Sequence, residues 1–350
     1  MRLLFVSLSY VFMIIVAMMT QPAHALYFGN DLTVTNQKDI PSSSLDLSSK
    51  QLTGTEKGDV YVVWVDNNSI YITSSHDNQK KFGSKIILSQ VNKLGLSPQV
   101  FATAKGDVYV VWVDKDNKTG DSNIEFINSN DSGMRFSSSK KLTGSKSLSF
   151  FPQLTATEKG DVYVVWVDKN NKTGDTDIIF RSSNDSGMSF DDRNKLRRSD
   201  SLLSFSPQLI ATEKGDVYVV WVDKNSTTAD RDITFRSSND RGRDFERAIN
   251  LNKGEKKLSN SSLPQLATTQ NDRVYVVWMD NQILFKELLV KDALVGNTIS
   301  LSNKTTSSLT PEITATKNGD IFVLWIDKNN TMDRSLHFKR ISQDYFDRNS

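Results

Sequence analysis

The 350-residue chain contains no cysteine, three histidines, seven prolines and almost no excess of either charge. Without cysteine there can be no disulfide, so the protein must be held together by its own hydrophobic core. A formal net charge of +2 gives no basic surface of the kind that binds nucleic acid. His24, His76 and His337 are scattered and form neither a metal-binding motif nor a catalytic pair.

Long apolar runs are missing after the first 25 residues. An apolar run from Leu3 to Met19 follows Arg2 and precedes Ala23-His24-Ala25, a pattern typical of signal-peptide cleavage. We interpret residues 1–25 as a signal peptide cleaved after Ala25, with an uncleaved membrane anchor as the alternative. Residues 26–350 are then expected to be secreted or on the cell surface, without a membrane span.

The chain is rich in repetition. The nine residues Gly106–Asp114 recur unchanged at 58–66, 160–168 and 215–223, and looser copies lie at 271–280 and 319–327. Every tryptophan falls in one of these copies, at spacings of 47 to 57 residues: Trp64, Trp112, Trp166, Trp221, Trp278 and Trp325. Self-similarity at this period indicates a repeat architecture.

Each repeat reads as four strands, which in the third copy are expected at 152–157, 161–168, 178–183 and 194–197. Both alternating faces of the second strand are apolar, so this strand should be buried on both sides of its sheet. Four-stranded units of this length are typical of propeller blades. We predict an all-β, six-bladed β-propeller over residues 26–350, with Pro98, Pro152, Pro207, Pro264 and Pro311 at the starts of first strands.

The sixth repeat ends one strand short. The segment Asp31–Thr35 matches the pattern of the fourth strands. We therefore expect Leu32 and Val34 to pack into the last blade, so that strands from both ends of the chain close the ring and remove its exposed edges.

A second motif, Ser-x-Asp-x-Gly-x-x-Phe, lies between the third and fourth strands. Asp is expected to accept backbone N–H bonds of its own turn, and Gly to adopt a positive φ. The three well-formed copies consist of Ser129, Asp131, Gly133 and Phe136; Ser183, Asp185, Gly187 and Phe190; and Ser238, Asp240, Gly242 and Phe245.

These copies resemble the Asp-box, or bacterial neuraminidase repeat, of sialidases. The resemblance implies a sialidase-like propeller whose boxes are structural hairpins on the face away from the active site. Family sialidases clamp the substrate carboxylate with three arginines and use a tyrosine nucleophile, a glutamate and an acid/base aspartate. This chain has no arginine between Arg2 and Arg135, and Tyr71 is the only internal tyrosine outside the repeated strand. We therefore assign no catalytic residue.

The second strands end in Trp-x-Asp, on the face that connection order places opposite the Asp-boxes. Together with aromatic residues that precede the first strands, these carboxylates would suit a sugar ring, although burial between blades is an equal alternative for the aromatics. The candidate ligand-binding residues are Asp66, Asp114, Asp168, Asp223, Asp280, Asp327, Phe150, Phe151 and Phe205.

The loops after the second strands are rich in oxygen ligands. Asp114, Asp116, Asp121, Asp168 and Asp175 could contribute to a Ca²⁺ site, since clustered carboxylates suit this cation. The loops do not match the helix–loop–helix calcium motif. A turn in which Asp accepts backbone N–H bonds is the favoured alternative.

Three functions remain open. The favoured one is a non-catalytic module that binds a glycan or an extracellular protein, because fold alone does not imply catalysis. An exo-sialidase-type glycoside hydrolase is the alternative. The third is a glycosylated envelope scaffold, since nine Asn-x-Ser/Thr sequons occur, including Asn67, Asn117, Asn171 and Asn303.

Overall fold

The computed structural model describes residues 45–76, 81–89, 93–144, 147–196, 201–225, 230–253, 261–269, 273–290, 294–302, 307–316, 319–328 and 334–342. These residues form β-strands and contain no α-helix. None of them belongs to a helix long and apolar enough to cross a membrane. The proposed signal peptide and the segment 31–35 lie outside the described residues.

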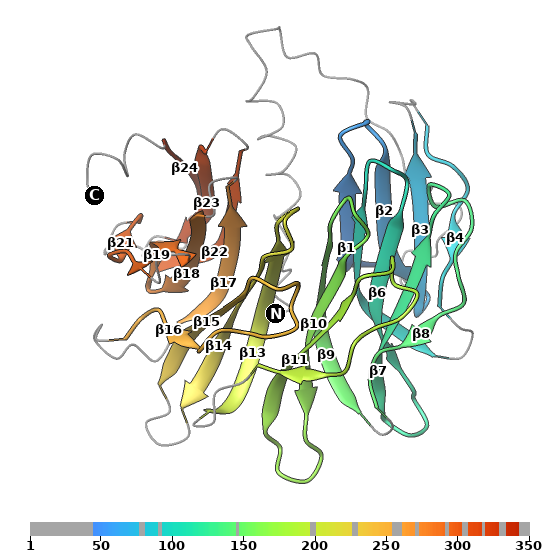
Figure 1. Cartoon of the computed structure of the whole chain (residues 1–350), viewed down its shortest axis with the longest axis horizontal. Coiled ribbons are helices and arrows are strands. Elements are labelled where there is room, and N and C mark those ends of the chain that lie inside the picture. The colour runs from blue at the N-terminus through green and yellow to red at the C-terminus, as the bar shows by residue number, and fades with distance from the viewer. Residues whose placement is uncertain are drawn as a thin grey trace, which may run out of the picture. The chain divides into compact units, whose positions relative to one another are not determined.

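The strands follow the six sequence repeats in order, and we number the repeats accordingly (Figure 1). Repeat 1 contains β1 (Leu45–Gly54), β2 (Val60–Asp66), β3 (Ser69–Ser75) and β4 (Ile86–Ile87). Repeat 2 contains β5 (Leu94–Ala102), β6 (Val108–Lys115), β7 (Ser122–Ser129) and β8 (Lys140–Lys141). Repeat 3 contains β9 (Leu148–Ala156), β10 (Val162–Lys169), β11 (Thr176–Ser183) and β12 (Asn194–Lys195).

The later repeats follow the same order. Repeat 4 contains β13 (Ser201–Ala211), β14 (Val217–Asn225), β15 (Arg231–Ser238) and β16 (Ile249–Asn250). Repeat 5 contains β17 (Ser262–Thr268), β18 (Arg273–Asp280), β19 (Gln282–Leu289), β20 (Leu294–Val295) and β21 (Ile299–Ser300). Repeat 6 contains β22 (Ser307–Ala315), β23 (Ile321–Lys328) and β24 (Arg334–Ile341).

Within every repeat the first three strands pair antiparallel in chain order. Repeats 1 and 4 are separate four-stranded sheets, and repeats 2 and 3 are joined by one parallel bridge between Ser122 and Leu148. In repeat 5 both short strands pair with β19, and repeat 6 shows three strands among the described residues. Multiple four-stranded antiparallel sheets in series are the arrangement expected of propeller blades.

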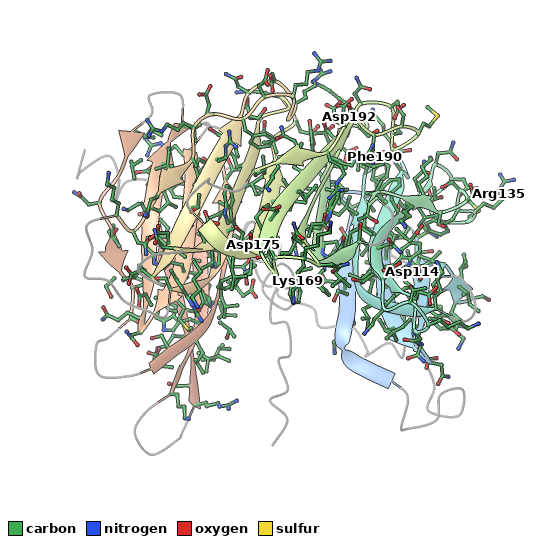
Figure 2. All side chains as sticks on the ribbon, turned by 90° about the horizontal axis from the view of Figure 1, so that it is seen from below. Asp114, Arg135, Lys169, Asp175, Phe190 and Asp192 are labelled. Atoms are coloured by element: carbon green, nitrogen blue, oxygen red, sulfur yellow. The ribbon has the colours of Figure 1, made fainter. Side chains whose placement is uncertain are left out.

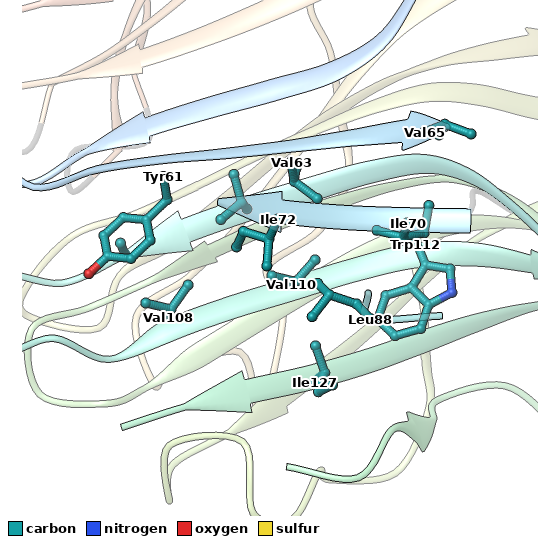
Figure 3. Packing of buried hydrophobic residues seen from close by; sticks show 12 residues of the cluster. Tyr61, Val63, Val65, Ile70, Ile72, Leu88, Val108, Val110, Trp112 and Ile127 are labelled. Atoms are coloured by element: carbon teal, nitrogen blue, oxygen red, sulfur yellow. The ribbon is translucent and has the colours of Figure 1, made fainter. Parts of the chain in front are cut away.

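The described residues divide into two compact units, one that ends at Lys195 and one that begins at Leu196. In the first unit, one cluster of buried residues joins repeats 1 and 2, and includes Tyr61, Ile72, Val110 and Trp112 (Figure 3). A second cluster joins repeats 2 and 3. In the second unit, equivalent clusters join repeats 4 and 5 and repeats 5 and 6. Each core therefore lies between the facing surfaces of neighbouring sheets.

The second strands are buried on both faces, as their sequence predicts. From Val162 to Val167 no residue of β10 exceeds 3% exposure, with alternate side chains on opposite faces of the sheet. Burial raises the pKa of Tyr61, Tyr109 and Tyr275 to about 12. These three tyrosines are therefore neutral core residues.

The prediction for the five prolines is wrong in detail. Pro152 is the fifth residue of β9, and the pairing of β9 with β10 shifts register beside it. A bulge tolerates a missing N–H as well as a strand start does. The residue before each proline has a positive φ between 46° and 52°: Ser97, Phe151, Ser206, Leu263 and Thr310.

The Ser-x-Asp-x-Gly turns form as predicted. Ser183 Oγ donates to Asp185 Oδ1 over 2.7 Å and accepts from the N–H of Gly187 over 2.9 Å. The φ of Gly187 is +79°. In the equivalent turn of repeat 2, bonds from the backbone and side chain of Arg135 lower the pKa of Asp131 to about 2. The acidic residues of these turns serve local structure.

Candidate functional site

The two ends of each sheet carry different features. In repeat 3, Val162 pairs with Ser183 at the end that bears the Ser-x-Asp-x-Gly turn, while Asp168 pairs with Asp177 at the other end. Figure 2 shows this separation in the first unit, with Asp114 and Asp175 away from Phe190. We call the end at which the second strands finish the Asp rim. The predicted separation of the two motifs is correct.

The repeated aspartates of the Asp rim are largely buried and hydrogen-bonded. The side chain of Asp168 is 18% exposed, and the other five residues are at most 6% exposed. Four of them accept a bond from a serine hydroxyl that lies in the first strand of the same repeat or directly before it. The pairs are Ser149–Asp168 (2.8 Å), Ser204–Asp223 (2.5 Å), Ser261–Asp280 (2.7 Å) and Ser308–Asp327 (2.6 Å). These bonds stabilise buried charge and give the aspartates a structural role.

Cationic side chains also contact these aspartates in the first unit. Lys85 Nζ lies 4.0 Å from Asp66, and Lys93 Nζ lies 2.6 Å from Asp114 Oδ2. Arg193 forms an ion pair with Asp168, and its guanidinium lies 6.0 Å from the ring centre of Trp166. In the second unit, Thr234 donates to Asp223 over 2.8 Å and His337 lies 3.4 Å from Asp327.

Repeat 2 departs from this pattern. Gly95, which pairs with Asp114, stands where repeats 3 and 4 have the bonding serine. A Cβ at Gly95 would come within 2.7 Å of Ile70, so there is no room for a serine side chain. Lys93 supplies the missing partner, and its hydrogen bond to Asp114 raises the pKa of Lys93.

Glu125 is a second departure in repeat 2. It pairs across the strands with Trp112 and Lys141, and it is only 8% exposed. Burial is the largest cause that raises its pKa; Asp114 adds to this, while a bond with Ser139 and the charges of Lys93 and Lys141 oppose it. A buried carboxyl with a raised pKa is a group whose protonation can serve chemistry.

Phe151 is the exposed aromatic of the Asp rim. It is 58% exposed, and its φ of +52° is costly for a bulky residue. The equivalent residues Ser97, Ser206, Leu263 and Thr310 are all partly buried. The ring of Phe150 lies 6.3 Å from that of Phe151, in a tilted arrangement. Phe151 is therefore a repeat-breaking apolar surface next to the Ser149–Asp168 pair.

Phe205 has a different environment. It is partly buried against the core cluster between repeats 4 and 5, and the guanidinium of Arg231 lies 5.5 Å from its ring centre. This position favours packing over ligand contact, which was one of the two roles that the sequence left open for the aromatics.

The loops proposed for calcium are compact turns. Asp116 Oδ1 accepts from the N–H groups of Lys118 (2.8 Å) and Thr119 (3.2 Å), and the N–H of Asp116 donates to the carbonyl of Asp121 (2.9 Å). The backbone closes in the same way between Asn170 and Asp175. Within the described part of the chain, no group of three or more His, Asp or Glu side chains is arranged to hold a metal ion. The calcium site stays a prediction.

The arginines of the third strands also have structural partners. Arg181 Nε and Nη2 donate to the carbonyl oxygens of Asp191 and Phe190, over 2.6 and 2.8 Å. Arg236 makes the same bonds to Glu246 and Phe245, over 2.7 Å each. Both guanidinium groups thus fasten the segment that follows a Ser-x-Asp-x-Gly turn.

Sequence reasoning did not single out Lys93, Glu125 or Arg193. Alignment of the six repeats could have flagged Gly95 and Glu125 as departures from the pattern. The pairing of Lys93 with Asp114 spans 21 residues and required the structure.

Comparison with known proteins identifies a fold. No family model and no curated protein sequence matches the chain. An alpha-L-arabinofuranosidase from Fusarium graminearum matches at 12% identity and a TM-score of 0.56, over 87% of this chain and 96% of that chain. A family 25 polysaccharide lyase, an ulvan lyase, matches at 11% identity and a TM-score of 0.57, over 84% of this chain and 78% of that chain. The NanB sialidase from Streptococcus pneumoniae matches at 10% identity and a TM-score of 0.51, over 91% of this chain and 72% of that chain.

These neighbours are propellers, and their likeness supports a sialidase-like β-propeller fold for this chain. Identities of 10 to 12% carry no assignment of residues or activity.

Proposed function

We propose that the protein is a secreted or cell-surface, sialidase-like propeller that binds glycans without cleaving them. The observation that carries this proposal is Phe151, an exposed aromatic held in a strained conformation on the Asp rim. The equivalent residues Ser97, Ser206, Leu263 and Thr310 share the positive φ but are partly buried and not aromatic, so Phe151 differs from them by placing an exposed ring at this point of the bulge. The arabinofuranosidase, ulvan lyase and sialidase neighbours add support for a carbohydrate ligand.

A sugar ring needs an apolar platform and polar partners at its edge. Phe151 offers the platform, because aromatic rings bury large apolar faces. The Asp168–Arg193 pair lies in the same repeat, and the Arg193 side chain is 37% exposed. Its remaining N–H groups can donate to hydroxyl or carboxylate oxygens.

The test is a glycan array with the full chain, with and without chelator, followed by assay of the eluate for released sugar. Phe151→Ala should lose at least tenfold in affinity with its thermal midpoint unchanged. Met188→Ala is the matched control, because Met188 is 67% exposed in the turn at the opposite end of the same repeat. Equal affinity of the two variants would remove Phe151 from the site. Release of sugar at an enzymatic rate would overturn the non-catalytic proposal.

Glu125 supports the alternative of a glycoside hydrolase. Its carboxyl group is buried with a raised pKa and is influenced by Asp114, and glycosidases use paired carboxyl groups. In this alternative Glu125→Gln abolishes sugar release, whereas glycan binding is unchanged. An eluate without released sugar removes this alternative.

A third alternative is a glycan-coated envelope scaffold. Asn67, Asn117 and Asn171 are exposed sequon residues on loops. Mass spectrometry of the protein from its native host decides this: occupied sequons together with an empty glycan array favour the scaffold.

We also propose six blades with closure by the segment Asp31–Thr35. Phe338 in β24 aligns with the buried Phe126, Phe180, Phe235 and Phe285, yet it is 45% exposed, and Leu336 is 61% exposed. Among the described residues no fourth strand pairs with β24. If closure is correct, a chain beginning at Ser44 melts at least about 5 °C lower than one beginning at Leu26, because a blade strand is lost. Equal melting temperatures contradict closure.

A further inference from the structure

A serine and a histidine two positions apart occur at the third strands of two repeats. In repeat 1, at the end of β3, Ser74 Oγ lies 2.9 Å from His76 Nε2. In repeat 6, within β24, Ser335 Oγ lies 2.9 Å from His337 Nε2. Side chains two positions apart in a strand point to the same face of the sheet, so local geometry accounts for both contacts. The two pairs differ in where a carboxylate meets the histidine.

In repeat 1 the carboxylate meets the other side of the imidazole ring. Asp59 Oδ1 lies 3.4 Å from His76 Nδ1, the nitrogen that does not face Ser74. The antiparallel register of β2 and β3 brings the two residues together. A carboxylate at Nδ1 favours the tautomer that carries its proton there, so Nε2 is left to accept the hydroxyl proton of Ser74. Hydroxyl, imidazole and carboxylate thus stand in series, the arrangement that activates a serine as a nucleophile.

Repeat 6 has the same serine–histidine distance but a different order of groups. Asp327 Oδ2 lies 3.4 Å from His337 Nε2, the nitrogen that also faces Ser335. One nitrogen cannot donate a proton to the carboxylate and accept the serine proton at the same time. Repeat 6 is therefore a comparison within the same chain that is matched in distance and different in chemistry.

The backbone on both sides of His76 is held in place. The N–H of Asp59 donates to Thr55 Oγ1 over 3.2 Å, and the carbonyl oxygen of Asp59 accepts from the N–H of Thr55 over 2.9 Å. Ser74 pairs with Tyr61 of β2. The Tyr61 ring meets the imidazole nearly at right angles, with ring centres 5.7 Å apart. The 3.4 Å contact is longer than an ideal hydrogen bond, as is common before a substrate binds.

His76 replaces a residue that is asparagine in three other repeats. Ser75 pairs with the first valine of its second strand, as do the serines that open the turns of repeats 2, 3 and 4. The residues that follow those serines are Asn130, Asn184 and Asn239, and all three are exposed. The side chain of His76 is 29% exposed and contacts a carboxylate. The fold does not require a histidine here, because asparagine serves in its place.

The site is partly open to solvent. Ser74 and His76 are both partly buried, and the side chain of Asp59 is 11% exposed. The turn of repeat 2 borders the site, since a Cβ at Gly133 would come within 3.1 Å of the Tyr61 ring. A half-open site with a packed neighbour favours a short acyl group over a long chain.

We propose that Ser74 is a nucleophile for esters of short acyl groups, with His76 as general base and Asp59 as positioning residue. Ser74 Oγ attacks the carbonyl carbon of the ester while its proton passes to His76 Nε2. The bond from this carbon to the alcohol oxygen breaks, and the alcohol leaves with that proton. Water, which gives a proton to His76, then attacks the acyl group, and the carboxylic acid and the Ser74 hydroxyl are released. The site lies at the opposite end of the sheet from the Asp rim, so it does not depend on glycan binding there.

The first experiment treats the full chain with a fluorophosphonate, which bonds to an activated serine oxygen with loss of fluoride. Mass spectrometry of peptides maps the label. Ser74 is expected to react at least tenfold faster than Ser335, although Ser335 is exposed and has the same distance to a histidine. No label on Ser74, or equal rates at the two serines, overturns the proposal without the need for any variant.

Variants then test the partners. His76→Gly should slow the labelling of Ser74 about a hundredfold, because a general base contributes about 10²- to 10⁴-fold, and added imidazole should restore part of the rate. His337→Gly is the matched control and should leave this rate unchanged. Asp59→Asn should slow labelling and remove the Nδ1–H tautomer of His76 in ¹⁵N NMR spectra. Circular dichroism confirms that each variant is folded.

The remaining outcomes are decisive as well. An unchanged labelling rate in folded His76→Gly overturns the role of the base, and an unchanged tautomer in Asp59→Asn overturns the positioning role. Hydrolysis of p-nitrophenyl acetate should fall at least tenfold in Ser74→Ala and stay unchanged in Ser335→Ala. Labelling of Ser74 without hydrolysis of this ester overturns the second step of the reaction.

Discussion

Arg181 Nη1 lies 3.1 Å from the carbonyl oxygen of Leu142, so one side chain links repeat 3 to repeat 2 while its other nitrogens fasten its own repeat. Burial lowers the pKa of this guanidinium, yet it stays charged because an arginine pKa lies far above neutral pH. Arg236 occupies the same position in repeat 4 and makes the same two bonds within its own repeat. These arginines are therefore framework residues and not substrate clamps.

Replacing Arg181 tests this role. Arg181→Met should lower the free energy of unfolding by about 2 kcal/mol, because three charge-assisted hydrogen bonds to carbonyl groups are lost. Denaturant unfolding measures the change. Arg135→Met is the control, since the Arg135 side chain is 89% exposed and its ion pair contributes little. Equal values for the two variants would contradict a framework role for Arg181.

Two glycines with the same backbone angle separate conformational strain from packing. Gly174 and Gly187 both have a φ of +79°, but a Cβ at Gly174 would meet nothing within 4 Å, whereas one at Gly187 would meet Phe126. Gly174→Ala should cost about 1 kcal/mol, the penalty of left-handed backbone. Gly187→Ala should cost about 3 kcal/mol, because overpacking is added. Chemical denaturation gives both values, and a difference near zero would mean that the turn of repeat 3 does not pack on repeat 2.

Lys93 is predicted to stabilise the buried carboxylate of Asp114. Lys93→Met should lower the free energy of unfolding by about 2 kcal/mol, because removal of one partner leaves the largely buried charge of Asp114 unpaired. The partial exposure of Lys93 keeps this loss below that of a fully buried ion pair. Lys85→Met is the matched control, because Lys85 is 41% exposed and lies 4.0 Å from Asp66. We expect Lys85→Met to lower the free energy of unfolding by less than about 0.5 kcal/mol. A similar loss in both variants would show that the short contact to Asp114 has no special weight.

Glu125 predicts a pH-dependent stability difference. Burial raises the pKa of Glu125 in the folded state. The contribution of Glu125 to the stability of the fold is therefore fully present below its unfolded-state pKa, and it is lost as the pH rises through the folded-state pKa. Glu125→Gln should therefore gain stability relative to wild type as the pH rises above the ordinary glutamate pKa of about 4.3. Thermal melting from pH 3 to pH 8 measures this difference. A gap between the two proteins that is constant with pH would contradict the raised pKa.

Much of the fold could be predicted from the sequence of the repeated second strand. Alternation with both faces apolar predicts burial on both sides, and Tyr163, Val165 and Trp166 have that environment. The short fourth strands and the turn at Gly187 also follow local rules of pattern and φ. The bulge at Pro152 could not be predicted from the sequence. The residue before a proline prefers extended backbone, and the positive φ at Phe151 is the opposite of this preference.

The candidate site could be predicted from the sequence only in part. The Trp-x-Asp motif marks the rim but does not reveal that Ser149 and Ser204 satisfy the carboxylates, since each bond joins residues 19 positions apart. Glu125 required the register of β6 and β7, which brings it opposite Trp112. Phe151 was predicted as an aromatic of the rim; its exposure follows from the strained bulge.

The identical copies of the second strand have a consequence for folding. Residues 108–114, 162–168 and 217–223 have the same sequence, so an exchange of any two would leave the protein chemically unchanged. These strands therefore cannot encode the order of the sheets, and a given third strand would pair as well with any of them as with the second strand of its own repeat. The correct pairing rests on the short connection from Lys169 to Thr176 and its counterparts, which favour the partner nearest along the chain. Lengthening such a loop should raise the population of misassembled chains during refolding, while native contacts stay unchanged.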